Sequence, residues 1–298
     1  MVYIIHPDAD VWNFVLKGID NGSSVMTRPL NAHCAKWQLA VRKILCNVRL
    51  HSRLLFDRQM QRELNTLKAG DSVVVCDHYE LCIFRTLNSL LDPDVKKFFW
   101  IWNPIKKNER DFYKYQFMKM VRAGFTPCTF DPQDGNRFGL PLYNQFFRMQ
   151  QGGTSEANDK YDFYFIGFAK NRESQVFDLQ KRLSAYKTYF KIVYSVEESI
   201  SYEDNIKNIR SSRCLVEIVQ EGQCGMTLRP LEALAFRKKL ISNNKDLINA
   251  EFYKPQNIFI IGVDSFEKID NFLNTPYIDI NKDIITKYDV LTWVNNFN

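Results

Sequence analysis

Residues 217–242 read EIVQEGQCGMTLRPLEALAFRKKLIS. This pattern predicts a buried strand that ends near Val219, a glycine-containing loop, a helix that begins around Thr227 and a further short strand from Lys239. A loop that runs into the start of a helix exposes unpaired backbone N–H groups and the positive end of the helix dipole. Because a phosphate or diphosphate suits that geometry, the segment predicts an α/β domain with an anion site where one strand ends.

Several residues of this segment have the chemistry that such a site needs. Thr227 is placed to cap the helix or to bond a phosphate oxygen, and Arg229 to neutralise a leaving diphosphate. Glu232, further along the helix, is placed to accept hydrogen bonds from the hydroxyls of a nucleotide ribose. Gly225 and Met226, just before the helix, complete the predicted diphosphate site. The alternative is that these residues only shape a turn and cap a helix.

Short apolar runs separated by helical stretches recur along the chain, which is typical of alternating strands and helices. Most of these runs lack polar alternation, as do strands that are buried on both faces of a parallel sheet. We therefore expect an α/β protein with helix-covered parallel sheets. The predicted strands are Val2–His6, Ser72–Asp77, Lys97–Trp102, Thr126–Asp131, Phe163–Gly167, Phe190–Val193, Cys214–Val219, Lys239–Ser242 and Asn257–Ile261.

One polar segment divides the chain. Residues 150–160 (QQGGTSEANDK) hold two adjacent glycines and no large apolar side chain, which is typical of a linker. We expect a first Rossmann-like domain over 1–150, a linker over 151–160, a second Rossmann-like domain over 161–280 and a closing helix over 281–298. Ligands of such sheets bind beyond the carboxyl ends of the strands.

The segment Gln220 to Leu234 resembles the donor-binding signature of group 1 GT-B glycosyltransferases, in which a glycine-bearing loop leads into a Leu-Glu-Ala helix. It is similar, more closely, to bacterial lipopolysaccharide and capsule biosynthesis transferases that carry Gln-x-Gly-Gln-Ser-Gly-Leu-Thr-x-Arg-x-x-Glu-Ala-Leu. Cys224 and Met226 depart from that pattern. Glu232 matches the second glutamate of the general group, and the first has no match at its usual spacing. The likeness extends upstream through residues 99–104 (FWIWNP).

The resemblance implies a GT-B fold, in which two Rossmann-like domains face a central cleft and a C-terminal helix closes the structure. Residues 1–150 would bind the acceptor and 161–280 the nucleotide-sugar. The implied activity is transfer of a hexosyl or related sugar to a growing surface polysaccharide or lipid-linked acceptor. We expect no cofactor and no metal, because the four histidines show no metal-ligand spacing. A nucleotide-sugar epimerase of the same fold is an alternative.

A second element supports a diphosphate site. The strand ending at Gly167 is followed by two cations, Lys170 and Arg172, at the opening of a helix. Gly167, Lys170 and Arg172 are predicted to meet the diphosphate from the side opposite Arg229, and the two cations to stabilise the departing nucleotide. Ordinary surface charges at a helix start are the alternative.

Acceptor chemistry is expected where strands of the first domain end. Asp77 and His78 follow one strand and are candidates to take the acceptor proton if the reaction inverts the anomeric centre, whereas retention needs no such base. His6, Glu80 and Asn103 are predicted on the acceptor side. A structural role is the alternative for each residue.

The formal charge is +6, and Arg28 to Lys68 carries nine Lys/Arg against two acids, interleaved with apolar residues. Such a stretch suits an anionic membrane surface, and a solvated helix face is the alternative. Nucleic-acid binding through this stretch is a third functional hypothesis, although our leading hypothesis needs no nucleic acid. No apolar run reaches the roughly 20 residues of a membrane span, and no signal-peptide pattern begins the chain. We expect a cytoplasmic protein, with this stretch as a candidate for peripheral attachment to the inner face of the cell membrane.

Overall fold

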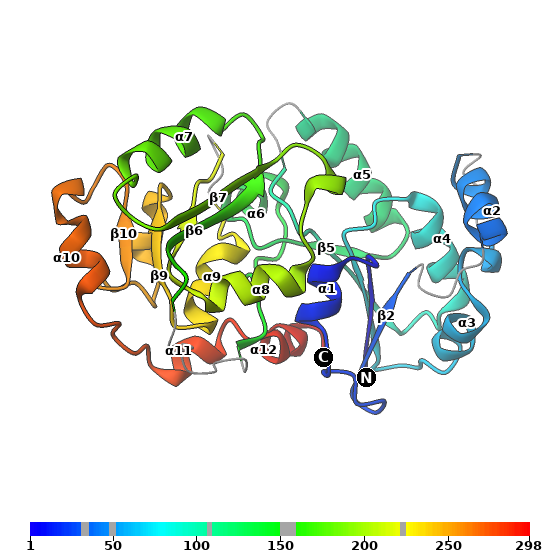
Figure 1. Cartoon of the computed structure of the whole chain (residues 1–298). Coiled ribbons are helices and arrows are strands. Elements are labelled where there is room, and N and C mark those ends of the chain that lie inside the picture. The colour runs from blue at the N-terminus through cyan, green and yellow to red at the C-terminus, as the bar shows by residue number, and fades with distance from the viewer. Residues whose placement is uncertain (31–35, 48–51, 106–108, 150–158, 221–224) are drawn as a thin grey trace. The chain divides into compact units, whose positions relative to one another are not determined.

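The chain folds into two compact units. The computed structural model describes residues 1–30, 36–47, 52–105, 109–149, 159–220 and 225–298 (Figure 1). Unit 1 contains Met1–Tyr143 together with Trp293–Asn298, and unit 2 contains Asn144–Thr292. The predicted linker falls mostly on residues 150–158, outside the described part of the chain.

Unit 1 is built on a five-stranded sheet in the order β2-β1-β3-β4-β5. All four neighbouring pairs are parallel, with Tyr3 opposite both Met26 and Val73. The strands are β1 (Val2–His6), β2 (Val25–Pro29), β3 (Ser72–Cys76), β4 (Lys96–Trp100) and β5 (Thr126–Cys128). The helices are α1 (Asp10–Val15), α2 (Lys36–Asn47), α3 (Arg58–Leu64), α4 (Leu81–Leu90), α5 (Arg110–Arg122) and α6 (Pro132–Phe138).

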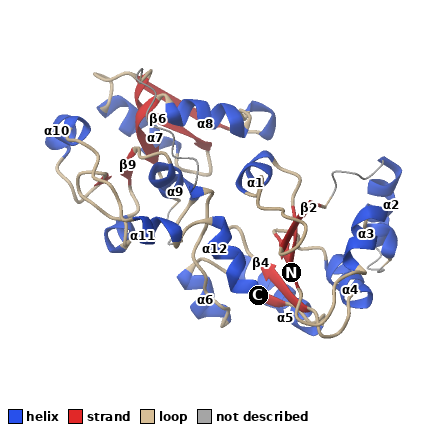
Figure 2. Cartoon of the chain, turned by 90° about the horizontal axis from the view of Figure 1, so that it is seen from below, coloured by secondary structure: helices blue, strands red, loops and turns tan. Residues whose placement is uncertain are grey.

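The two faces of this sheet are covered by different helices. One buried cluster joins inward side chains of β1, β3 and β4 to residues of α3, α4 and α5, with α2 packed against it through Leu45. On the other face, Trp100 contacts Trp293 at a ring-centroid distance of 5.4 Å, and Ser72 Oγ donates to the Phe297 carbonyl. Figure 2 shows this sheet close to edge-on, with α1 on one side and α3 and α4 on the other.

Unit 2 repeats the architecture with the order β10-β9-β8-β6-β7, again all parallel. One face packs against α7 and α10, while α8 and α9 contact β6, β8 and β9. The strands are β6 (Tyr161–Phe168), β7 (Thr188–Val193), β8 (Ser212–Glu217), β9 (Lys239–Ser242) and β10 (Ile258–Ile260). The helices are α7 (Glu173–Arg182), α8 (Tyr202–Arg210), α9 (Leu228–Ala235), α10 (Ile269–Asn274) and α11 (Lys282–Thr286). The last helix, α12 (Val290–Val294), begins in unit 2, and its last two residues belong to unit 1.

The prediction of two Rossmann-like parallel α/β domains is confirmed, and each of the nine predicted strands is present. The sequence analysis missed β2, an edge strand in which only Val25 is buried. A strand with one buried residue gives almost no apolar run, so its pattern is weak. The predicted closing helix over 281–298 is instead divided into α11, α12 and a short 3₁₀ turn over Asn295–Phe297.

No helix in the described ranges is both long and apolar enough to cross a membrane.

Candidate functional site

Both sheets have the doubly wound strand order 2-1-3-4-5, counted from the first strand of each unit. In this topology the chain leaves the first and third strands in opposite directions, so a crevice opens between their carboxyl ends. That switch point lies between β1 and β3 in unit 1 and between β6 and β8 in unit 2. Apart from Asn103, which follows β4, the predicted site residues lie at or after the ends of these four strands, although the strand order itself was not predicted.

In unit 2, Arg172 links the carboxyl ends of β6 and β8. Its Nε donates to the Phe168 carbonyl at 3.1 Å and its Nη1 donates to the Ile218 carbonyl. Two consecutive residues with positive φ, Lys170 (46°) and Asn171 (61°), make the sharp turn that brings Arg172 back over the strand end. The two predicted cations therefore have different structural roles. Arg172 is fixed by two backbone carbonyls, whereas Lys170 forms part of the turn.

Gly167 is required by this packing. A Cβ at that position would lie 2.6 Å from Nη2 of Arg172 and 3.3 Å from Cζ of Phe165, both closer than normal contacts. The missing side chain is thus what lets the guanidinium lie against the end of β6. The predicted role of Gly167 in backbone approach to a diphosphate stays a prediction.

Thr227 caps α9, as predicted from the helix start. Its Oγ1 accepts a hydrogen bond from Arg229 N at 3.2 Å and donates to Oε1 of Glu217. Because the hydroxyl proton is given to Glu217, Thr227 serves the protein framework in this structure. Gly225 and Met226, just before the cap, are respectively buried and half-buried.

Glu217 is a residue of this cluster that was not predicted from the sequence. This last residue of β8 is 4% exposed, and it accepts hydrogen bonds from the hydroxyls of Thr227 and Ser242. It thereby joins the ends of β8 and β9 to the start of α9. Its position in the sequence could have identified it, because Glu217 is an acidic residue at the end of a buried strand, just before the glycine loop.

Arg229 is oriented by Glu232. The two side chains form an ion pair with Arg229 Nη1 2.8 Å from Glu232 Oε2, and Arg229 Nη2 donates to the Ile166 carbonyl at 3.2 Å. Oε1 of Glu232 accepts from Tyr202 Oη at 2.6 Å and from Asn205 Nδ2 at 3.2 Å. With 2% exposure and both oxygens engaged, Glu232 here acts as a support for Arg229. Its contact with a ribose stays a prediction.

Charges of both signs meet in this cluster. Burial raises the pKa of Glu217, while the hydrogen bonds from Ser242 and Thr227 and the charges of Arg229 and Arg172 lower that pKa in part. The two guanidinium groups lie beside the carboxyl groups of Glu217 and Glu232. The start of α9 adds the positive end of the helix dipole at the crevice between β6 and β8.

In unit 1, His6 and Asp77 lie at the ends of β1 and β3. His6 is 3% exposed, and burial lowers its pKa to about 4, so the ring is neutral at physiological pH. Asp77 has φ 52°, a left-handed conformation that Asp tolerates better than most residues. Burial, and then the nearby Glu80 charge, raise the pKa of Asp77 to about 6. A carboxyl group that titrates near neutrality is suited to general base chemistry.

The other residues predicted on or near the acceptor side follow two different strands. His78 Nδ1 lies 3.8 Å from Glu80 Oε2, and Glu80 Oε1 lies 3.7 Å from Arg42 Nη2. Burial lowers the pKa of His78, while the Glu80 charge raises it in part. Asn103 is exposed in the loop after β4. The structure thus brings His78 and Glu80 together beside Asp77, on the segment that follows β3.

The basic stretch Arg28 to Lys68 is only partly a surface feature. Arg28 pairs with Asp20 at 2.7 Å and Glu63 at 2.8 Å, and Arg42 is 7% exposed. These two guanidinium groups stabilise unit 1 internally and are not free for an anionic surface. Exposed cations of the stretch include Lys36 and Lys43 on α2, and residues 31–35 and 48–51 lie outside the described part.

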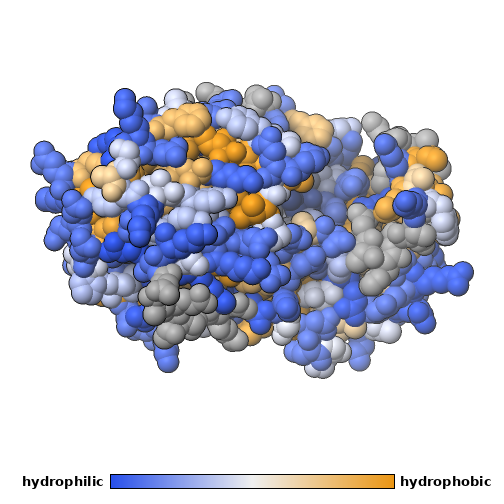
Figure 3. All heavy atoms as spheres, in the orientation of Figure 1, coloured by the Kyte–Doolittle hydropathy of each residue, from blue (hydrophilic) through white to orange (hydrophobic). Residues whose placement is uncertain are grey.

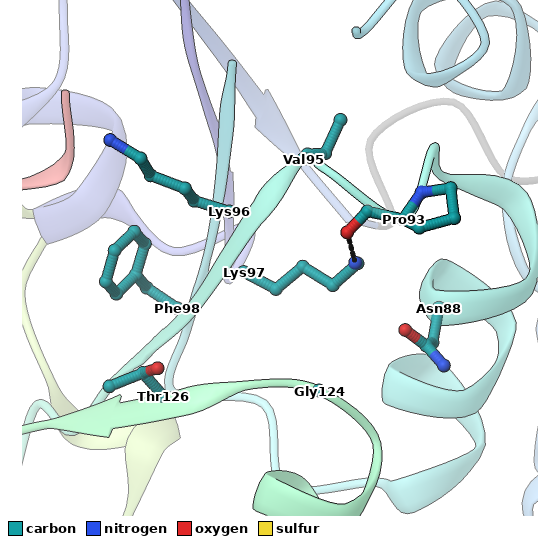
Figure 4. A pocket seen from close by; sticks show the side chains of 8 residues that line it. All are labelled: Asn88, Pro93, Val95, Lys96, Lys97, Phe98, Gly124 and Thr126. Carbon is teal, nitrogen blue, oxygen red and sulfur yellow. Dashed lines mark hydrogen bonds between the residues drawn. The ribbon is translucent and has the colours of Figure 1, made fainter. Parts of the chain in front are cut away.

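A pocket lies at the opposite edge of the unit 1 sheet (Figure 4). Lys97 Nζ donates to the Pro93 carbonyl at 3.4 Å inside it. The lining residues are Asn88, Pro93, Val95, Lys96, Lys97, Phe98, Gly124 and Thr126. Because β4 and β5 begin here, this pocket is separate from the switch point at their carboxyl edge.

Asp-x-Asp spacing occurs in this sequence at Asp8 and Asp10 and again at Asp92 and Asp94. Neither pair belongs to a group of three or more His, Cys, Asp or Glu side chains that could hold a metal, as far as the described residues extend.

Comparisons with known proteins identify solved structures of distant similarity. No protein-family model and no curated protein sequence matches the chain. The structure of accessory secretory proteins 1, 2 and 3 of Streptococcus pneumoniae aligns over 86% of this chain and 53% of that chain, with 10% identity and a TM-score of 0.46. The structure of TarM aligns over 76% of this chain and 51% of that chain, with 9% identity and a TM-score of 0.43. The chain thus spans about half the length of both matched structures.

Proposed function

We propose that this protein is a metal-independent glycosyltransferase that binds a nucleotide-sugar in unit 2 and an acceptor in unit 1. The observation that carries the proposal is the convergence of Arg172 and Arg229 on the switch point between β6 and β8. The two guanidinium groups come from separate segments. Arg172 donates to the carbonyl of Ile218, just after β8, and Arg229 donates to the carbonyl of Ile166 in β6. Such preorganised cations can stabilise a leaving diphosphate without a metal ion.

The start of α9 adds to this site. Its first turn carries the positive end of the helix dipole. Pro230 has no N–H and Thr227 Oγ1 accepts that of Arg229, so the first-turn backbone donor that we propose for the ligand is Leu228 N–H. In the proposed complex the diphosphate lies across this helix start, with Gly225 and Met226 alongside it. Lys170 approaches from the turn after β6, and the nucleotide ribose lies toward Glu232.

The proposed reaction forms a bond between an acceptor hydroxyl oxygen and the anomeric carbon of a hexosyl or related sugar. The bond from that carbon to the phosphate oxygen breaks, and the nucleotide leaves with the bonding electrons. For an inverting reaction Asp77 takes the acceptor proton, because its pKa of about 6 leaves it largely ionised at neutral pH. For a retaining reaction the leaving phosphate takes that proton. We propose a growing surface polysaccharide or a lipid-linked saccharide as the acceptor, with His6, Glu80 and Asn103 on its side.

Calorimetric titration with UDP, GDP, ADP and CMP tests the donor site. We expect one nucleotide to bind, and Arg172→Ala and Arg229→Ala each to weaken that binding at least tenfold, because a charge-assisted hydrogen bond contributes roughly 1.5–3 kcal/mol. Arg182→Ala is the matched control, since Arg182 is exposed on α7 and stacks on Phe266.

Equal affinity in all three variants would remove this crevice from the donor site. A preference for CMP would redirect the proposal to transferases with monophosphate donors. Binding without turnover of any nucleotide-sugar and acceptor pair, but with epimerised sugar, would replace transfer by epimerisation.

A further inference from the structure

One helix of unit 1 exposes an apolar face to solvent. α5 buries Phe117 and Met120 in the core and yet exposes an apolar side chain at every third position. The exposed fractions are 56% for Phe112, 50% for Tyr115, 46% for Met118 and 59% for Val121. Successive members of this row are neighbours on the helix, but each step of three residues turns by roughly 60°, so the row winds over the solvent side from Phe112 to Val121. Exposed large apolar side chains gathered in this way mark an interaction surface more often than isolated ones do.

Cations are interleaved with this apolar row. Lys114 and Arg122 are exposed on α5, and Lys119 lies over the Tyr115 ring with Nζ 3.6 Å from the centroid. Within the described residues, none of these three cations is in an ion pair with a carboxylate. The whole helix carries four Lys/Arg and one acid, Asp111. A solvent-exposed helix side that mixes large apolar and basic side chains is complementary to an anionic lipid surface, where the long basic side chains reach the headgroups.

A second helix has the same character. α2 exposes Trp37 (60%) and Ile44 (61%), with Lys36 and Lys43 exposed beside them and no acid along the helix. Orange apolar spheres are visible over α2 in Figure 3. Both helices pack on the same face of the unit 1 sheet, and α4 contacts each of them. The two exposed faces therefore belong to one helix layer.

The direction of these helices relates the surface to the candidate acceptor site. α2 follows β2 and α5 follows β4, so both helices begin at the carboxyl edge of the sheet, where His6 and Asp77 lie. Trp37 and Phe112 are in the first turns of their helices. Trp37 and Phe112 are thus the exposed large apolar side chains of α2 and α5 closest to that edge. Trp and Tyr side chains, here Trp37 and Tyr115, are favoured at membrane interfaces.

We propose that the exposed faces of α5 and α2 form a docking surface for anionic lipid bilayers. The apolar side chains enter the boundary between headgroups and acyl chains, and the lysines and Arg122 contact lipid phosphates. The surface does not depend on the proposed sugar transfer, because its residues are separate from the crevice between β6 and β8. This surface does not use Arg28 and Arg42 of the predicted basic stretch, because these two residues are paired with carboxylates of unit 1.

Vesicle flotation tests the surface. We expect the full chain to float with vesicles of phosphatidylcholine containing about 30% phosphatidylglycerol, and not with phosphatidylcholine alone, because basic side chains are attracted to anionic headgroups. The double variant Lys114→Glu with Arg122→Glu, and the triple variant Phe112→Ser, Tyr115→Ser and Val121→Ser, should each reduce binding at least tenfold. Added salt should weaken binding by the wild type.

Matched controls lie on unit 2. Lys181→Glu with Lys187→Glu reverses two exposed lysines, and Phe177→Ser with Val196→Ser removes exposed apolar groups (54% and 73%). These variants should float as the wild type does, and all variants should keep the wild-type melting temperature within a few degrees. Absent flotation, equal flotation with neutral vesicles, or α5 variants that float normally would each overturn the proposal. Concentration-dependent dimerisation that the α5 variants abolish, without vesicle binding, would assign the surface to a second copy of the chain.

Discussion

Glu217 accepts a hydrogen bond from the hydroxyl of Thr227, and this contact ties the carboxyl end of β8 to the first turn of α9. The same carboxyl group accepts from Ser242 at the end of β9. A buried acceptor therefore fixes the helix whose second residue is Arg229. Because Arg229 is also held by Glu232, the cation is positioned from both ends of the turn. The geometry of the proposed donor site depends on these internal contacts more than on any exposed residue.

Removing the Thr227 hydroxyl should destabilise unit 2. Thr227→Val keeps the side-chain shape but loses the cap on Arg229 N and the bond to Glu217, at a cost of about 1–2 kcal/mol. Thr227→Ser keeps both bonds and should restore most of the loss. Differential scanning calorimetry of the three proteins gives the comparison. Equal melting of the Val and Ser variants would show that the cap contributes nothing.

Glu217→Gln should weaken the same junction. An amide has one acceptor oxygen in place of two, so it cannot accept from both Thr227 and Ser242 unless one hydroxyl reverses. We expect a loss of roughly 1–3 kcal/mol in the free energy of unfolding. In Ser242→Ala the wild-type carboxyl keeps its Thr227 donor, so the loss should be smaller. Denaturant unfolding of both variants measures the difference, and an unaltered midpoint for Glu217→Gln would contradict the assigned contacts.

Gly167→Ala should weaken nucleotide binding with little change in the melting temperature. The new methyl group would overlap the end of the flexible Arg172 side chain, which can move at little cost to folding. We expect the variant to melt close to the wild type but to bind nucleotide several-fold more weakly, because Arg172 leaves the crevice. Gly135→Ala in α6 is the control, since its nearest contacts are ordinary at 3.6 Å. A Gly167→Ala protein with wild-type affinity would show that Arg172 need not lie where it does.

Asp77 should make stability depend on pH. Its pKa is raised in the folded protein from 3.8 to about 6, so the folded state binds a proton more tightly than the unfolded state. The resulting stabilisation is fully present below about pH 4 and is lost as pH rises through about 6, with an upper limit of about 3 kcal/mol. Asp77→Asn removes the charge and should be more stable than the wild type at pH 7.5, and this difference should shrink toward pH 4.

Urea unfolding at several pH values measures that difference. A difference that does not change between pH 4 and 7.5 would show that Asp77 has an ordinary pKa. His6 contributes with the opposite sign, because its lowered pKa gives stability that is present above about pH 6.5 and lost as pH falls through about 4. The paired comparison of wild type and Asp77→Asn cancels the His6 contribution.

The fold class, nine of the strands and the helix start at Thr227 could be predicted from the amino-acid sequence. Buried parallel strands are continuous apolar runs, and a capped helix start is a local pattern, so neighbouring residues contain both signals. The sequence also identified the segments around Arg172 and Arg229. The three-dimensional structure was needed to show that Arg28 and Arg42 are paired with carboxylates of unit 1, that Glu232 supports Arg229 and that Glu217 joins three elements. These contacts join residues distant along the chain, and which polar groups meet is set by strand order and packing, which no local pattern encodes.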